Sequence, residues 1–445
     1  MQGAAIAAGL VLLAAVGAAA FAPALYGLAL ALAAAGALAL LAWRHPVAAS
    51  VAWLVVVGST LEMSLGDILG PSFYQPIIAV EKGAGLLLAV LAVLRYGGRW
   101  DWANPGLAFV AMFAAGLVHG LYPGLGLLES LRSLVGSAAP YAFSFSRLSR
   151  PWARAVIRTT ALIPMLNVAA GSVLDLAGVR PLFVASGGWR LGALSHPAFL
   201  AGFALAAIYA CLVELYREGS RRHIALMAVN FVILVLTGAR APLAYGVAVA
   251  GLTLAFVPSP AFPRRERMLL LLGALALAPL LAALAGSLSE LRLFNLLDHD
   301  ADGLSGREEI WAYFEHAAAG SPWVGWGVGA GNVVIPQTSR VVRIMHTWAA
   351  HNEYLRIEVE GGRIGEALLL ACFVLWAAGH MAVLPRTDRA IIRLVFVAFA
   401  CHAATDNVLI STSASVLFAF VAAVFARGAL EAEDAARGGE GSGTR

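Results

Sequence analysis

The sequence has little charge, and almost none of it comes from lysine. Only 13% of the 445 residues are charged, 60% are hydrophobic, and Lys82 is the single lysine. An ordinary soluble domain of this length carries more charge, so the composition excludes that class and predicts a membrane protein. Stretches of about 20 mainly apolar residues, the length of a membrane-spanning helix, recur from Ala4 to Ala426. We therefore expect one membrane domain over residues 1–430, with its polar parts confined to loops.

Several chemical signatures are also missing. Cys211, Cys372 and Cys401 lie in apolar stretches without a CxxC pair, which predicts buried thiols rather than a disulfide or a zinc site. There is no P-loop, Rossmann glycine pattern, HExxH or GxSxG, so ATP-driven transport and metalloprotease chemistry have no support. No soluble segment interleaves basic and aromatic residues, and nucleic-acid binding is therefore not expected.

Arginine carries the topology signal, because basic residues collect in cytoplasmic loops. Each basic cluster follows an even number of apolar stretches when the N-terminus lies inside. The clusters are Arg44–His45, Arg95–Arg99, Arg147–Arg158, Arg217–His223, Arg264–Arg267 and Arg386–Arg393. This pattern predicts an all-α, polytopic transmembrane helix bundle of about 12–14 spans.

The same topology leaves three notable segments outside, at residues 62–75, 178–195 and 287–350. The last is long for a loop, which is typical of a functional segment, and residues Arg307 to Ala319 have helical spacing of apolar side chains. The Gly-rich, charged tail at 431–445 is expected to be disordered and cytoplasmic.

Some arginines lie on the outer side, against the general pattern. They are Arg132, Arg190, Arg240, Arg307, Arg340 and Arg343. A guanidinium can bind phosphate through two parallel hydrogen bonds, so several arginines that converge on one pocket would suit a diphosphate. Alternatively, each arginine could anchor a helix end at the membrane interface. Arg240 favours the functional interpretation, because TGAR at 237–240 lies between two apolar helices, where an unpaired charge is costly.

His351 stands where the long outer loop meets an apolar helix. A neutral imidazole can take a proton from a sugar hydroxyl as a general base, but a lone histidine here can also be a hydrogen-bonded anchor. Gly361 and Gly365 would let the following helix pack closely against a neighbour. His196 and the Asp406–Asn407 pair could line a polar cleft or simply mark helix ends.

A calcium-loop pattern is also present. Asp298, Asp300, Asp302, Gly303 and Glu309 match D-x-D-x-D-G-x5-E. The alternative is an acidic turn before the 307–319 helix, with Ser305 as its N-cap. The pattern leaves both interpretations open.

Three motifs in this order resemble the O-antigen ligase/polymerase superfamily. They are TGAR at 237–240, SGREEIW at 305–311 followed by GWGVG, and HNEYLRIEVEGGRIG at 351–365. The similarity covers about 188–427, including RLGALSHP at 190–197, with 287–350 as the catalytic loop. The resemblance implies a metal-independent, inverting glycosyltransferase that needs no cofactor. By motif, His351 would be the catalytic base, Arg190 and Arg240 would hold the diphosphate, and Arg307 is a weaker candidate for the same task.

The resemblance also implies partners and a location. The donor would be a glycan linked to undecaprenyl diphosphate, and the acceptor a glycan or a lipid-linked molecule. The site would face the periplasm from a multi-pass protein of the bacterial inner membrane, among membrane lipids, with a flippase and a chain-length regulator as further candidate partners. An O-antigen or exopolysaccharide polymerase is slightly favoured over a ligase acting on lipid A–core or protein. The alternative of another class is a transporter or flippase for an anionic lipid-linked glycan.

Overall fold

A computed structural model describes residues 36–37, 39–63, 70, 74–186, 188–284, 290–293, 307–336, 338–345 and 347–440. The expected first span and the aspartates of the calcium-loop pattern lie outside these residues.

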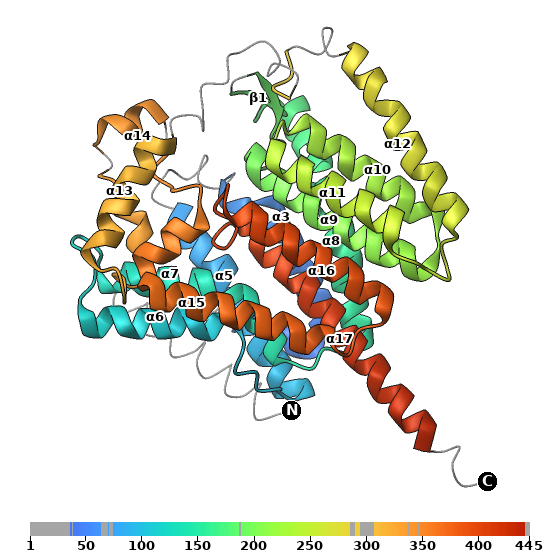
Figure 1. Cartoon of the computed structure of the whole chain (residues 1–445), viewed down its shortest axis with the longest axis horizontal. Coiled ribbons are helices and arrows are strands. Elements are labelled where there is room, and N and C mark those ends of the chain that lie inside the picture. Colours follow the sequence, from blue (N-terminus) through green and yellow to red (C-terminus); the bar gives the residue numbers. More distant parts are fainter. Residues whose placement is uncertain are drawn as a thin grey trace.

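The described chain is helical almost throughout, which confirms the predicted all-α fold class (Figure 1). The α-helices are α3 (Pro46–Ser59), α5 (Tyr74–Tyr96), α6 (Pro105–His119), α7 (Leu127–Ala138), α8 (Arg150–Leu176), α9 (Pro197–Glu218), α10 (Arg221–Leu236), α11 (Arg240–Phe256), α12 (Arg264–Leu284), α13 (Arg307–Gly320), α14 (Arg340–Met345), α15 (Glu353–Met381), α16 (Arg386–Ala403) and α17 (Thr412–Glu440). Two 3₁₀ helices, η3 (Ala139–Phe145) and η6 (Ala330–Asn332), and two short strands, β1 (Phe183–Ala185) and β2 (Trp189–Leu191), complete the elements named here.

Within the described residues, 4 helices are long and apolar enough to cross a membrane, namely α8, α9, α15 and α17. The apolar helices α3, α6 and α11 are shorter. The chain is thus a helical membrane protein, but these long helices are fewer than the 12–14 spans expected from apolar stretches. One expected span, 129–146, is instead divided into α7 and η3 near Pro140, since proline has no N–H for the helical ladder.

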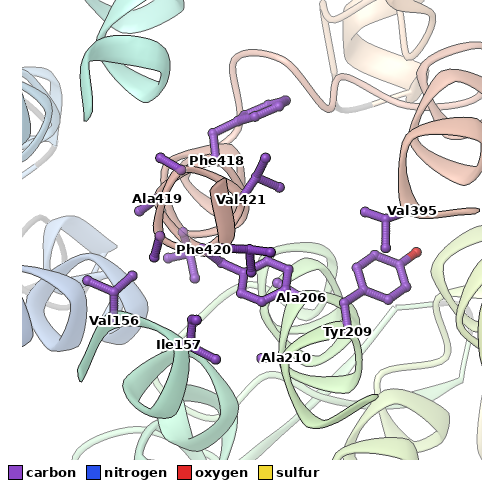
Figure 2. Close-up of a cluster of buried hydrophobic side chains, with 14 of the residues drawn as sticks. Val156, Ile157, Ala206, Tyr209, Ala210, Val395, Phe418, Ala419, Phe420 and Val421 are labelled. Carbon is purple, nitrogen blue, oxygen red and sulfur yellow. The ribbon is translucent and has the colours of Figure 1, made fainter. Parts of the chain in front are cut away.

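The centre of the bundle is α9, whose side chains are buried along nearly the whole helix. Alanines at 206 and 210 let its neighbours approach closely, and Val156 and Ile157 of α8 and Phe420 of α17 fill the space around them (Figure 2). This packing holds the ends of several helices in fixed relative positions.

Ion pairs join helix ends on one side of the bundle. Arg217 at the end of α9 binds Asp388 of α16 at 2.6 Å and Glu431 of α17 at 2.5 Å. Arg427 of α17 pairs with Glu214 of α9. The basic clusters at 217–223 and 386–393, which the topology placed on one side, therefore do lie together.

Two expectations need correction. Residues 431–440, expected to be disordered, continue α17 to Glu440. This part is rich in alanine and glutamate, which favour helix, and Glu431 is anchored by Arg217. Cys401, expected to be buried, is exposed on α16, whereas Cys211 and Cys372 are buried.

The strands β1 and β2 form an antiparallel hairpin between α8 and α9 that the sequence did not indicate. Arg190 lies in β2, opposite Val184. Residues 290–292 run along the other side of β2, where Trp189 N donates to Glu290 O at 2.8 Å and Arg292 N donates to Trp189 O at 3.2 Å. The hairpin therefore holds two distant arginines close together.

Candidate active site

The candidate site lies at the end of the bundle away from the Arg217 ion pairs. It is built from the loop before α9, the start of α11, the start of α15 and the loop between α16 and α17. The 22 residues of α9 separate the two ends by about 33 Å at 1.5 Å per residue.

His351 is held in a strained backbone conformation directly before α15. Its φ is 49°, which is uncommon for a residue with a side chain. Asn352 caps the helix, because its side chain accepts a hydrogen bond from Tyr354 N at 3.1 Å. The imidazole Nδ1 lies 3.1 Å from Asp406 Oδ1, and Nε2 lies 3.3 Å from Thr347 Oγ1.

Asp406 orients this imidazole. Burial opposes ionisation of the carboxyl, but the hydrogen bond and charge of His351 outweigh it and hold the pKa of Asp406 below its usual value. An ionised carboxylate can only accept, so the proton of the neutral imidazole resides on Nδ1 and the lone pair on Nε2. Nε2 is therefore the atom that can take a proton.

A buried ion triad fixes the helix that begins after His351. Arg356 Nε lies 2.5 Å from Glu353 Oε2, and Arg356 Nη1 lies 2.8 Å from Glu360 Oε2. Glu353 Oε1 also accepts from Leu409 N at 2.7 Å, which ties the helix to the loop that carries Asp406. Sequence reasoning missed this triad, although the spacing of Glu353, Arg356 and Glu360 along one helix face could have indicated it.

A sharp kink at Gly362 separates this first part of α15 from its long second part. Gly362 has φ 60° and ψ −170°. The carbonyls of Val359 and Glu360, which the kink frees, accept from Trp326 N and Gly327 N at 2.9 Å each. A Cβ added at Gly362 would lie 2.4 Å from Trp323 C, so only glycine fits there.

The small residues that flank the kink do allow close packing, as predicted. A Cβ added at Gly361 or Gly365 would collide with Met112 of α6, at 2.2 and 2.8 Å from its sulfur. This contact and the 322–327 segment together hold α15 at its kink.

Arg190 belongs to a cluster of positive charge around Arg292. The side chain of Arg190 is 7% exposed, and its Nε donates to Thr237 O at 2.8 Å, within the TGAR motif. A Cβ added at Gly238 would lie 3.1 Å from Arg292 Cβ and 3.6 Å from Arg190 Cγ, so both side chains cross the same glycine. Burial and the charge of Arg292 lower the pKa of Arg190 to about 10, which leaves it protonated at neutral pH.

Arg292 links the cluster to the other predicted arginines. Its positive charge acts on Arg240, and burial followed by the charge of Arg307 lowers its own pKa. Arg307 Nη1 donates to Thr405 O at 2.8 Å, directly beside Asp406. Sequence reasoning did not single out Arg292. It lies in the outer 287–350 segment, so it departs from the positive-inside pattern just as the other outer arginines do, and this could have indicated it.

The cluster has an excess of positive charge. Among the described residues, no carboxylate forms an ion pair with Arg190, Arg240, Arg292 or Arg307. His196, the N-cap of α9, is within electrostatic range of both Arg190 and Asp406. Burial and then the charge of Arg190 lower the pKa of His196. Such an arrangement favours a bound anion with several oxygen atoms.

A cleft of about 1,100 Å³ adjoins the site; most of its surface is apolar, and we name it the polar cleft for the charged and polar side chains that also line it. Its wall includes Lys82 and Ser133, Asn332, the exposed Trp348, and Arg356 of the ion triad. Trp348 is three residues before His351, so the cleft lies next to the loop that carries His351.

The remaining outer arginines lie elsewhere. Arg132 lines the polar cleft and pairs with Glu129 at 3.5 Å. Arg340 and Arg343 are in α14, and no contact in the described part of the chain joins them to His351 or to the arginine cluster. Of the calcium-loop pattern, the described Glu309 lies in the first turn of α13. That helix confirms the one predicted within the outer loop.

A comparison with known families found a match. Residues 224–370, about a third of the chain, match the family model described as O-antigen ligase. His351, Arg240, Arg292 and Arg307 lie inside the match, whereas Arg190 and Asp406 lie outside it. No curated protein matches the chain. The family match supports the resemblance of this membrane protein to the O-antigen ligase/polymerase superfamily, and with it a ligase or polymerase type of function.

Proposed function

We propose that the protein transfers a glycan from a lipid diphosphate donor to a sugar hydroxyl, with His351 as the general base. The observation that carries this proposal is the His351–Asp406 pair, with Arg307 bound to the adjacent Thr405 carbonyl at 2.8 Å and the Arg190–Arg292 cluster nearby. A base and an anion-binding group within one site are what displacement of a diphosphate requires.

The proposed reaction is a single displacement. The acceptor oxygen attacks the anomeric carbon of the donor and forms the new glycosidic bond. The bond from that carbon to the diphosphate oxygen breaks, and its electron pair leaves with the diphosphate. The acceptor proton passes to Nε2 of His351, while Asp406 stabilises the resulting imidazolium. Attack opposite the leaving group inverts the anomeric configuration.

The arginines supply the charge that this step needs. Negative charge on the departing diphosphate rises as the bond breaks, so fixed guanidinium groups stabilise the transition state more than the ground state. Arg190 is already oriented by the Thr237 carbonyl, and Arg240 follows in the same motif. The clamp is therefore proposed to consist of Arg190, Arg240 and Arg292, with Arg307 nearest to the base.

The acceptor glycan is proposed to enter the polar cleft. An exposed aromatic ring, here Trp348, and amide and hydroxyl groups such as those of Asn332 and Ser133 suit a sugar surface. Charges of both signs line the cleft, so it does not select strongly for an anionic glycan. A second lipid-linked glycan would make the enzyme a polymerase, which remains slightly favoured, and lipid A–core or protein would make it a ligase.

The site is proposed to face the extracytoplasmic side of the inner membrane. The end of the bundle with the Arg217 ion pairs carries basic clusters, so the positive-inside rule makes it the cytoplasmic end. The site lies at the other end of α9, which supports an extracytoplasmic location.

The function is tested with purified protein, a glycan on a polyprenyl diphosphate and a matching acceptor. The expected result is a glycosylated acceptor whose new linkage is inverted, formed in a 1:1 ratio with free lipid diphosphate. In liposomes, movement of intact donor across the membrane without transfer would contradict the proposal and favour the transporter alternative.

A further inference from the structure

We propose that an apolar groove between α15 and α16 binds the hydrocarbon chain of the lipid diphosphate donor. This inference rests on the proposed function and specifies where the lipid part of the donor lies. The groove has a volume of about 500 Å³, within the range of about 300–1,000 Å³ that is usual for ligand pockets.

The groove runs between two helices that separate from each other. The residues 382–385 join α15 to α16, and away from this connection the two helices diverge (Figure 1). The lining is aliphatic and aromatic along both helices. It includes Leu370, Phe373 and Val374 of α15 and Phe396, Val397 and Ala400 of α16.

The wide, outer end of the groove meets the active site. Glu353 and Tyr354, the first residues of α15 after His351 and its cap, line this end, and so does Leu409, three residues after Asp406. The hydrogen bond from Leu409 N to Glu353 Oε1 joins this end of the groove to the loop that carries Asp406. A chain lying in the groove therefore ends beside the base.

The first part of α15 separates the groove from the polar cleft. Glu353 and Ile357 face the groove, whereas Arg356 and Glu360, on the neighbouring face of the same helix, line the cleft. The helix that begins at His351 thus has a hydrocarbon surface on one side and a saccharide-compatible surface on the other. This division fits the proposed reaction. The lipid of the donor would lie on one side of the helix and the sugars of the acceptor on the other, and the two substrates would meet at the base.

The charges at the groove support the donor's chain as its occupant. Arg307 is bound at Thr405, between the outer end of the groove and the arginine cluster, where a diphosphate attached to the chain would arrive. Beyond Glu353 at its outer end, the groove itself is lined by one carboxylate, Glu366, and one guanidinium, Arg393, whose charges balance, and its other lining side chains along the two helices are mainly apolar. The groove therefore suits the hydrocarbon chain better than the diphosphate.

The test compares two adjacent residues of α15 that are similarly exposed. Val374 lines the groove and is 67% exposed, whereas Leu375 is 62% exposed and does not line it. Val374→Trp partly fills the groove, and Leu375→Trp adds the same bulk outside it. Each variant is assayed with two donors that carry the same glycan, one on a long polyprenyl chain and one on a short, soluble prenyl chain.

We expect Val374→Trp to raise the KM for the long-chain donor about tenfold, since losing the burial of two methylene groups is worth that factor. Its KM for the short-chain donor and for the acceptor should equal that of the wild type, and Leu375→Trp should match the wild type with both donors. An unchanged KM for the long-chain donor, an equal loss with both donors, or a change confined to the acceptor would overturn the inference. Absence of transfer by the wild type with either donor would instead contradict the proposed function.

Discussion

Nδ1 of His351 lies 3.1 Å from Oδ1 of Asp406, although the two residues are 55 positions apart in the chain. The pair joins the start of α15 to the loop between α16 and α17, and the Glu353–Leu409 hydrogen bond reinforces the same connection. The orientation of the proposed base thus depends on a residue outside the segment that matches the O-antigen ligase family.

Asp406→Asn tests this dependence. An amide is uncharged and can present its NH₂ to the ring, so it no longer selects the tautomer with its lone pair on Nε2 or stabilises the imidazolium. We expect the rate of transfer to fall about 10²-fold or more, measured as kcat with saturating donor. Asn407→Asp, the matched change at the neighbouring position, should cost much less.

The pH dependence of stability provides a control on the same variant. Because the folded-state pKa of Asp406 is depressed, its contribution to stability is fully present above the unfolded pKa of about 3.9 and is lost as the pH falls through the lower folded-state value. The difference in melting temperature between wild type and Asp406→Asn should therefore be largest near neutral pH and shrink below about pH 4. A constant difference across this range would argue against an ionised Asp406.

Arg240→Lys tests the diphosphate clamp. Lysine keeps the charge but lacks the planar fork, so bidentate contact is lost and kcat/KM for the donor should fall by about 10-fold or more. Arg340→Lys in α14, outside the cluster, serves as the control and should leave kcat/KM unchanged. Full activity of Arg240→Lys would show that Arg240 merely anchors a helix end.

Chelation distinguishes the two interpretations of the acidic segment at 298–309. If the carboxylates form a turn before α13, they gain from the helix dipole and need no ion. The purified protein should therefore keep its transfer activity in excess EGTA, and Asp300→Asn should cost little. A loss under EGTA that calcium restores would instead identify a calcium site.

Single cysteines test the orientation in the membrane. Ala177, beyond the end of α8, and Ala261, between α11 and α12, are both exposed and lie at opposite ends of the bundle. After the native cysteines are removed, an impermeant thiol reagent applied to intact cells should label Ala177→Cys and not Ala261→Cys. The reverse labelling would invert the proposed topology.

The features that could be predicted from the sequence are local ones. Apolar stretches indicated membrane helices, and the spacing of Ile310, Trp311 and Phe314 indicated α13. The outer arginines stood out against the positive-inside pattern, and the structure brings Arg190, Arg240 and Arg307 together around Arg292.

The features that could not be predicted depend on distant partners. The kink at Gly362 requires the hydrogen bonds of the 322–327 segment, and nothing in the local apolar pattern of α15 indicates them. The β1–β2 hairpin that positions Arg190 consists of two 3-residue strands, too short for a recognisable alternation. Asp406 could equally have been a helix-end residue until its contact with His351 was known.

The most direct measurement is the rate of glycan transfer by His351→Ala beside His316→Ala. His316 is an exposed histidine of α13 with no role in the proposed mechanism, so its variant controls for loss of a histidine in the outer segment. Both proteins should reach wild-type abundance in the membrane, His316→Ala should transfer at the wild-type rate, and His351→Ala should be slower by at least about 10²-fold. Transfer by His351→Ala within about tenfold of the wild-type rate would contradict the assignment of His351 as the general base.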